Sequence, residues 1–446
     1  MATTPKAEQH SMTRIAGTSF IGTAIEWYDF FIYANATALV FGALFFPRLS
    51  PTAGTLASLS TFAIGFLARP LGGVLMGHFG DRVGRKSMLV ASLMIMGGAT
   101  ILIGLLPTYD SIGVWAPILL VALRFVQGLG VGGEWGGAVL VAVEHAPRAR
   151  RGFYGSFPQM GVPAGVILSN LVFLSLNSAL TREQFLAWGW RVPFLLSAVL
   201  IAVGLYARIR IAEAPVFLEA KRRQEDARMP LVELLRGHWR RVVLVGLAFT
   251  AANTIGYITV VYVLSYATGP LRMERTTVLL LVLSASVVQL AAIPLLSSLS
   301  DRLGRRRVFV AGAVLSLLWV APMFLLMDTR NAALGLIGIT GAVIFLSAMY
   351  GPQAAIAAEL FPTRVRYSGA SLGYQISTII GGSVAPLVAT ALYARTGTSM
   401  SVALYLAVVC LISLLAVLRV PETRHANLTA VPPPPSPAAR GGAARA

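Results

Sequence analysis

The chain has 446 residues, of which 56% are hydrophobic and only 12% are charged, with a formal net charge of +18. A soluble globular domain carries about twice this share of charged residues, so the composition argues against a soluble fold. The apolar residues gather in continuous runs of about twenty, the length of a helix that spans a bilayer, and this argues against a β-barrel.

We predict an all-α polytopic membrane protein with twelve transmembrane helices in two pseudo-symmetric six-helix bundles. The spans are expected near 18–43, 54–78, 88–106, 113–144, 152–176, 190–209, 241–266, 276–296, 308–327, 332–357, 366–393 and 400–419. The predicted domains are a cytoplasmic N-terminal segment (1–17), an N-terminal bundle (18–209), a cytoplasmic connector (210–240), a C-terminal bundle (241–419) and a disordered cytoplasmic tail (420–446).

Most of the 36 lysines and arginines fall in alternate loops between these spans. Positive loops stay on the cytoplasmic side, so both termini are expected to be cytoplasmic. The net charge is then explained by topology and by contact with anionic lipid, and no nucleic-acid partner is expected. The lone Cys410 excludes a disulfide within the chain, and the five histidines form no spaced cluster that would indicate a metal site.

Two acidic residues lie in the first predicted span. Glu26, Asp29 and Tyr33 are spaced so that they share one helix face. Acidic groups inside a bilayer are costly and usually face a cavity or a partner. Glu26 and Asp29 are therefore candidates for proton coupling, and Tyr33 for lining the substrate path. The alternative is that these residues only bind a basic side chain.

The second span contains Arg69, whose equivalent in the second half, 220 positions later, is Gln289. The charge is therefore not part of a repeat. Arg69 is a candidate for binding an anionic substrate, or for neutralising Glu26 or Asp29.

A ten-residue loop follows this span and recurs in the second half, at 77–86 and 297–306. Asp81 and Asp301 fall at the ends of their spans, where each can accept hydrogen bonds from a neighbouring helix start or pair with an arginine. A second loop also repeats, with Glu144 matching Glu359 and Arg151 matching Arg366. Charge networks of this kind can hold one conformation and break in another. The predicted cytoplasmic gate comprises Asp81, Arg82, Arg85, Asp301, Arg302, Arg305, Glu144, Glu359 and Arg366.

The fourth span carries Arg124, Gln127 and Glu134 along one stripe. Arg124 and Glu134 are ~15 Å apart along a helix axis, too far to pair directly. Arg124 is the first candidate for binding a substrate carboxylate, with Gln127 beside it, and Glu134 is a third candidate for proton coupling. Gly128, Gly132 and Gly136 repeat every four residues and predict close helix packing. In the second half, Asn253 and Tyr257 of the seventh span are candidate substrate ligands, and the alternative is a hydrogen bond between helices in the core, the commoner role of such residues.

Several motifs together resemble a known family. They are Glu26-Trp27-Tyr28-Asp29-Phe30, Arg69-Pro70-Leu71-Gly72-Gly73, Gly133-Glu134-Trp135-Gly136-Gly137, Glu144-His145-Ala146-Pro147, Trp190-Arg191-Val192-Pro193-Phe194 and Glu359-Leu360-Phe361-Pro362-Thr363-Arg364-Val365-Arg366. With the repeated Gly/Ser-x-x-x-Asp-Arg-x-Gly-Arg loop, the chain resembles the major facilitator superfamily, and within it the metabolite:proton symporter family. Ser297 replaces the leading glycine in the second loop.

The resemblance implies a proton-coupled symporter that imports a small carboxylate-bearing metabolite by alternating access. It implies no cofactor, and its expected partners are a small-molecule substrate, protons and membrane lipid. We expect a monomer in the bacterial inner membrane. The alternatives are uptake of a zwitterionic osmolyte such as betaine or proline, an exporter of the same fold, and a nutrient receptor that does not transport. An enzyme is not expected, since no nucleophile–base set appears.

Overall fold

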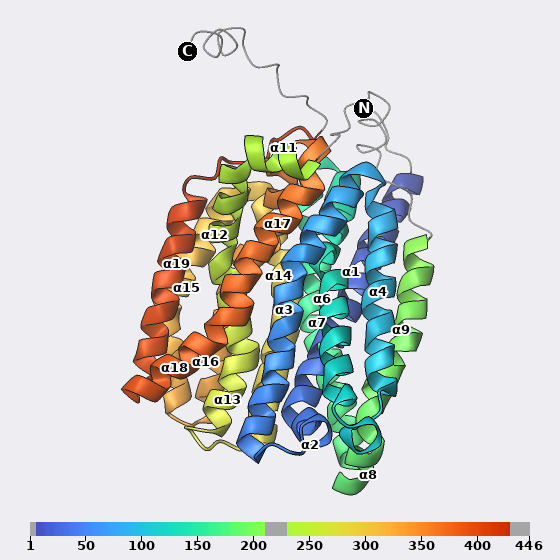
Figure 1. Ribbon diagram of the computed structural model, residues 1–446. Coiled ribbons are helices and arrows are strands. Elements are labelled where there is room, and N and C mark those ends of the chain that lie inside the picture. Colours follow the sequence, from blue (N-terminus) through green and yellow to red (C-terminus); the bar gives the residue numbers. More distant parts are fainter. Residues whose placement is uncertain (1–5, 210–229, 429–446) are drawn as a thin grey trace, which may run out of the picture.

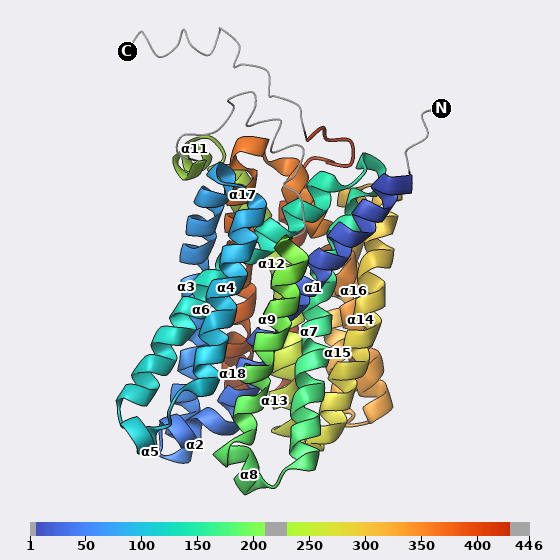
Figure 2. The same cartoon turned by 90° about the vertical axis from the view of Figure 1, so that its right-hand side faces the viewer.

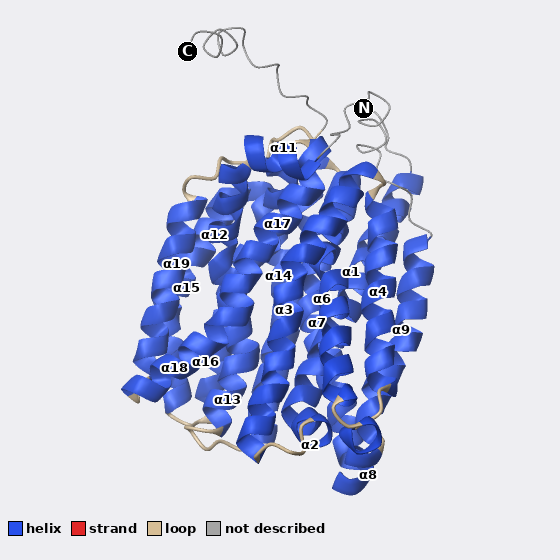
Figure 3. Cartoon of the chain, in the orientation of Figure 1, coloured by secondary structure: helices blue, strands red, loops and turns tan. Residues whose placement is uncertain are grey.

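The computed structural model describes residues 6–209 and 230–428, and this part of the chain is built of helices joined by short loops (Figure 3). The end of the molecule where α1 begins and α19 ends, at the top of Figure 1, is called the terminal face here. The other end is called the opposite face. Both copies of the repeated loop lie at the terminal face, because α3 and α14 end there.

The N-terminal half contains six long helices and several short ones. Their bounds are α1 (Lys6–Ala36), η1 (Thr37–Phe41), α2 (Gly42–Phe45), α3 (Pro51–Arg82), α4 (Arg85–Leu105), α5 (Tyr109–Ile112), α6 (Trp115–His145), η2 (Arg148–Arg150), α7 (Arg151–Ala179), α8 (Arg182–Ala187), η3 (Gly189–Arg191) and α9 (Val192–Ile209). In Figure 2, α1 slants across the bundle beside α7, against which it packs.

The C-terminal half repeats the pattern. Its elements are α11 (Pro230–Gly237), α12 (Trp239–Tyr257), η4 (Ile258–Tyr262), α13 (Val263–Thr268), α14 (Arg275–Leu303), α15 (Arg305–Asp328), α16 (Ala332–Leu360), η5 (Thr363–Val365), α17 (Arg366–Thr378), η6 (Ile379–Val384), α18 (Ala385–Thr396) and α19 (Ser399–Val417). The seventh and eleventh spans are continuous through the π-helical turns η4 and η6.

Ten of the described helical segments are long and apolar enough to cross a membrane. The other two long helices, α1 and α3, carry charges within their length, namely Glu26 and Asp29 in α1 and Arg69 in α3. Together they make the predicted twelve, and the all-α fold is confirmed. The first helix begins at Lys6, inside the segment predicted to precede the bundle, and the connector contains the short helix α11 before α12 begins at Trp239.

The prediction of a disordered tail from residue 420 is wrong for its first nine residues. Val420, Thr423 and Leu428 are buried, at 2%, 4% and 2% exposure. The disorder was predicted from the run of four consecutive prolines, and that run begins only at Pro432. Residues 429–446 lie outside the described part of the chain, as do residues 210–229 of the predicted connector.

The two halves meet through equivalent helices. The second long helix of each half packs on the fifth long helix of the other, so α3 packs on α17 and α14 packs on α7. A glycine with positive φ lies shortly after the end of each of α3 and α14, with φ of +134° at Gly84 and +109° at Gly304. A residue with a side chain rarely adopts this conformation, so glycine makes both tight turns of the repeated loop.

The predicted close packing by glycine is confirmed on α6. A Cβ atom on Gly128 would lie 2.4 Å from the Gly65 carbonyl oxygen, and one on Gly132 would lie 2.0 Å from that of Arg69. Both neighbours are backbone atoms of α3. A Cβ atom on Gly136 would lie 2.1 Å from the hydroxyl of Ser371 on α17. These contacts bring α6 against the helices that carry the site.

We expect Gly132→Ala to destabilise the fold, because the added methyl group would collide with the backbone of α3. Overpacking of this kind costs about 1–3 kcal/mol, so thermal unfolding followed by tryptophan fluorescence in detergent should show a melting temperature several degrees lower. Gly98→Ala is the matched control, because a Cβ atom there meets nothing within 4 Å. Equal melting temperatures for the two variants would contradict the packing described.

Candidate functional site

The carboxylate of Asp81, near the end of α3, caps the start of α17 in the other half. It accepts hydrogen bonds from the backbone amides of Tyr367 (3.1 Å) and Ser368 (2.9 Å), and from the Ser368 hydroxyl (2.8 Å). The first amides of a helix lack partners within the helix and carry partial positive charge. One buried carboxylate therefore ties the two halves together, through the geometry that the sequence predicted for it.

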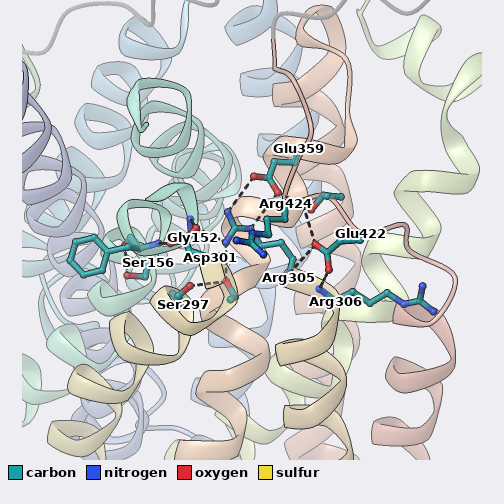
Figure 4. A network of polar contacts seen from close by, with 12 residues as sticks. Gly152, Ser156, Ser297, Asp301, Arg305, Arg306, Glu359, Glu422 and Arg424 are labelled. Carbon is teal, nitrogen blue, oxygen red and sulfur yellow. Dashed lines mark hydrogen bonds and ion pairs between the residues drawn. The ribbon is translucent and has the colours of Figure 1, made fainter. Parts of the chain in front are cut away.

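Asp301 makes the equivalent contact in the opposite direction. It accepts hydrogen bonds from the backbone amides of Gly152 (2.9 Å) and Phe153 (2.8 Å) at the start of α7, as Figure 4 shows. Arg305, the first residue of the next helix α15, donates to the same carboxylate at 2.6 Å. Asp301 thus serves both as a helix cap and as an ion-pair partner.

The second repeated loop adds two more carboxylates to the terminal face. Glu144 of α6 pairs with Arg366 of α17 at 2.8 Å, which is a further link between the halves. Its equivalent, Glu359 of α16, instead accepts from Arg305 (3.4 Å) within the C-terminal half and from the hydroxyl of Thr423 (2.7 Å). The equivalent loops therefore have different partners.

Residues 420–428 lie over this network and are called the C-terminal strap here. Glu422 accepts from the backbone amides of Arg305 (2.9 Å) and Arg306 (3.2 Å), so it caps the start of α15. Arg151 of the N-terminal half donates to the Ala426 carbonyl (2.8 Å), and Arg366 donates to that of Leu428 (3.0 Å). The strap was missed by sequence reasoning, because contacts to backbone carbonyls leave no residue pattern.

The predicted gate residues do not all join the network. Asp81, Asp301, Arg305, Glu144, Glu359 and Arg366 do. Arg82 and Arg302 are exposed, and the guanidinium of Arg82 lies 3.5 Å from the ring of His78. Arg85 begins α4, and its side chain lies outside the described ones.

An aromatic layer lies between this network and the middle of the molecule. Trp135 of α6 stacks on Tyr374 of α17, with ring centroids 3.9 Å apart and planes 5° from parallel. The Trp135 ring donates to Gln159 (2.6 Å), which in turn donates to the backbone carbonyl of Tyr350 in the other half (2.7 Å). The layer joins both halves and separates the centre from the terminal face.

A small cavity follows at the centre, between the two halves. Its volume is about 40 Å³, counted as space open to the centre of a water molecule. Its walls come mainly from the C-terminal half, with α1 and α7 on the other side. The lining residues are Trp27, Phe31, Val162, Ala252, Asn253, Gly256, Tyr257, Val260, Gln289, Leu346, Tyr350 and Tyr374. Of the six predicted substrate ligands, Asn253 and Tyr257 are among these lining residues.

Arg69 lies beside this cavity, held by aromatic rings. Its guanidinium carbon is 4.7 Å from the ring centroids of both Phe30 and Phe66 and 5.7 Å from that of Trp27. Tyr257, in the cavity wall, interacts electrostatically with Arg69 and packs on Phe66 at 5.7 Å. Gln289, the repeat equivalent of Arg69, is itself a lining residue. Arg69 is not itself a lining residue, but its contacts with Trp27 and Tyr257 place it next to the cavity wall.

Arg124 lies deeper in the N-terminal bundle, in a chain of hydrogen bonds. It donates to Gln127 (2.6 Å), Gln127 donates to Thr100 (2.8 Å), and Thr100 donates to Asp29 (3.0 Å). Asp29 is fully buried and also accepts from Ser197 at 2.6 Å. This places Arg124 and Asp29 at the two ends of one polar chain.

The remaining predicted residues lie around this chain. The Tyr33 ring lies 4.0 Å below the Arg124 guanidinium, and its hydroxyl bonds to Thr61 at 2.6 Å. Glu26 is buried at 4% exposure and acts electrostatically on Tyr257 and Tyr350 of the cavity wall. Glu134 is buried at 1% exposure, one residue before Trp135 of the aromatic layer. Sequence reasoning missed Thr100 and Ser197, whose single hydroxyls carry no pattern.

Comparison with known proteins gives matches along almost the whole chain. Residues 15–238 match the family described as "Sugar (and other) transporter", and residues 245–445 match "Major Facilitator Superfamily". The inner membrane metabolite transport protein YhjE of Escherichia coli (strain K12) is 45% identical over 94% of this chain and 96% of its own length. The shikimate transporter of the same strain is 41% identical, over 93% and 95%.

A proline/betaine transporter of Salmonella typhimurium is 34% identical over 93% of this chain and 84% of its own. Among solved structures, the proton:xylose symporter XylE superposes with a TM-score of 0.76 over 95% of this chain and 98% of its own, at 18% identity. That likeness concerns the fold. The long helices, the two equivalent halves and these relatives lead to one conclusion: the chain belongs to the major facilitator superfamily, and it is a multi-pass transporter of metabolites rather than an enzyme.

Proposed function

We propose that the protein is a proton-coupled symporter that imports a small carboxylate-bearing metabolite by alternating access. The observation that carries the proposal is Arg69, a cation buried beside the cavity, whose guanidinium lies over three aromatic rings and interacts with Tyr257 of the cavity wall. A cation in the membrane interior is costly unless it meets a partner. A guanidinium can bind a carboxylate through two parallel hydrogen bonds, so a substrate carboxylate fits this position.

The structure changes the order of the two candidate arginines. Arg124 was the first choice, but its guanidinium already donates to Gln127 and lies over Tyr33. Arg69 lies closer to the lining residues, so it becomes the first choice for the substrate. Both guanidinium groups approach the Phe30 ring, at 4.7 and 5.4 Å, and their combined positive charge favours an anion in the cavity.

Two relatives indicate which carboxylates to consider. Shikimate is a ring carboxylic acid, and a shikimate transporter is 41% identical to this chain. Proline and betaine are zwitterions that also carry a carboxylate, and a proline/betaine transporter is 34% identical. The aromatic cavity wall, with Trp27, Tyr257 and Tyr350, suits a flat ring, and an aromatic wall can also hold a quaternary ammonium. Uptake of a zwitterion is therefore the second candidate function.

Asp29 is the proposed proton carrier. Its hydrogen-bond partners in the described chain are two hydroxyls and no cation. An ionised carboxylate is costly in such a place, so a proton can bind there and be released when the surroundings change. The chain through Thr100 and Gln127 ends at Arg124, so a change at Asp29 can reach the arginine pair. Glu26 and Glu134 remain second candidates.

The closure of the terminal face supports alternating access. A cavity of about 40 Å³ has room for about three water molecules and not for a metabolite. The two halves must therefore separate on one side before a substrate can enter. With the orientation proposed from loop charge, the terminal face is cytoplasmic, and the conformation described is closed towards the cytoplasm of the bacterial inner membrane.

Uptake into proteoliposomes under an imposed pH gradient tests the function. We expect inward proton flux to drive accumulation of at least one carboxylate from a panel containing shikimate, other monocarboxylates and dicarboxylates, proline and betaine. Accumulation of betaine or proline alone would favour the second candidate. Flux only against the direction of proton entry would identify an exporter, and binding without flux would identify a receptor. Either of these last two results contradicts the proposal.

Replacement of the proton carrier should separate transport from coupling. In Asp29→Asn we expect pH-driven accumulation to be lost, while substrate exchange across the membrane is partly retained. Retained exchange shows that the variant is folded. Asp110→Asn, which removes an exposed acid in α5, is the control and should accumulate normally. If accumulation survives neutral substitutions at Asp29, Glu26 and Glu134 alike, the coupling assignment is wrong.

A further inference from the structure

A groove at the terminal face lies between the start of α15 and the end of α19. It encloses about 930 Å³. Its inner part is apolar, formed by Val310, Val314, Leu315 and Leu418, of which Val314, Leu315 and Leu418 are 37%, 43% and 43% exposed. Its outer rim is basic, formed by Arg306, Arg307, Arg424 and His425. A helix surface of this kind, apolar towards the membrane interior and basic at its edge, faces lipid.

The repeat shows which of these charges the fold already uses. In the first half, Lys86 donates to the carbonyl of Ile209 at the end of α9, at 2.6 Å. In the second half, Arg306 donates to the carbonyl of Leu418 just after α19, also at 2.6 Å. Both residues tie the start of the third helix to the end of the sixth. The next position is Ser87 in the first half and Arg307 in the second, so Arg307 is a charge that the repeat does not require.

Two arginine side chains of the rim remain available to a ligand. The side chain of Arg307 is exposed, and it makes no hydrogen bond or ion pair with the residues that the structure describes. The side chain of Arg424 is half-buried and also makes no hydrogen bond or ion pair within the described residues, while its backbone amide donates to Glu422. The one acid of the groove, Glu422, already accepts from the amides of Arg305 and Arg306. Its carboxylate is therefore already held by the start of α15, as Figure 4 shows, and by the backbone amide of Arg424.

We infer that this groove binds an anionic glycerophospholipid. Its phosphate would bind between Arg307 and Arg424, because a guanidinium pairs well with phosphate oxygens. Its acyl chains would lie along Val310 and Val314, which continue down α15 from the rim. Basic pockets between membrane helices are known sites for anionic headgroups. A free phosphate ion would use the rim alone and would leave the apolar inner part uncovered.

Binding there would act on the gate. Arg424 belongs to the C-terminal strap, and Arg307 to the first turn of α15, which Glu422 caps. A lipid held by both arginines would fasten the strap to α15, and the strap contacts Arg151 of the other half. The lipid would therefore stabilise the closed terminal face, whatever substrate the transporter carries.

Thermal unfolding in detergent with added lipid tests the inference. We expect phosphatidylglycerol to raise the melting temperature of the wild-type protein more than phosphatidylcholine does. The variant Arg307→Gln/Arg424→Gln should lose most of this difference. The matched control is Arg148→Gln/Arg150→Gln, which removes two exposed arginines from the terminal face of the other half and should keep the difference.

Native mass spectrometry on the same variants counts bound lipid and gives a second measure, independent of unfolding. Fewer bound phosphatidylglycerol molecules in the groove variant alone would support the site. An equal loss in both variants would mean general attraction to positive charge, and would overturn it. Glycerol 3-phosphate supplies the headgroup chemistry without acyl chains. If it stabilises the wild-type protein as much as the lipid does, the groove binds a free phosphate compound and the lipid assignment is wrong.

Discussion

The conformation depends on a carboxylate of one half that caps a helix of the other half. Asp81 holds the start of α17, and Asp301 holds the start of α7. Lipid gives membrane helices little hydrophobic reason to associate, so polar contacts and close packing decide how the halves meet. Helix-start amides need partners in any conformation, and water can replace the carboxylates if the terminal face opens. The caps made by Asp81 and Asp301 can therefore be both strong and reversible.

Both halves contain a capping carboxylate, but the residues around it differ between the halves. The buried acids and arginines proposed for coupling and binding, Asp29, Arg69 and Arg124, lie in the N-terminal half, while the cavity wall comes mainly from the C-terminal half. The strap lies over the repeated loop of the C-terminal half. There Glu422 accepts from the backbone amide of Arg305, and the hydroxyl of Thr423 donates to Glu359. In the proposed mechanism, the duplicated helices are the parts that move, and the residues that differ between the halves bind the substrate and the proton.

The features of the fold and of the candidate site that depend on neighbouring residues in the sequence could be predicted from it. Runs of apolar residues predict membrane helices, because the bilayer sets their length. Glycine spacing predicted the α6–α3 contact, and the position of Asp81 at a helix end predicted its capping geometry. The contacts behind the proposed order of Arg69 and Arg124 could not be predicted, since they depend on which guanidinium donates to Gln127 and which lies beside the cavity wall. The strap could not be predicted either, because its acceptors are mostly backbone carbonyls.

We propose that the two caps hold the terminal face closed. Spin labels at Val83 and Leu303 test it most directly, because these exposed residues occupy equivalent places in the two repeated loops. With Cys410 replaced by serine, double electron–electron resonance should show a short-distance population in the parent protein. Asp81→Ala and Asp301→Ala should each shift population towards longer distances, while Asp110→Ala should not. An unchanged distance distribution in both cap variants would show that the caps do not hold the terminal face closed.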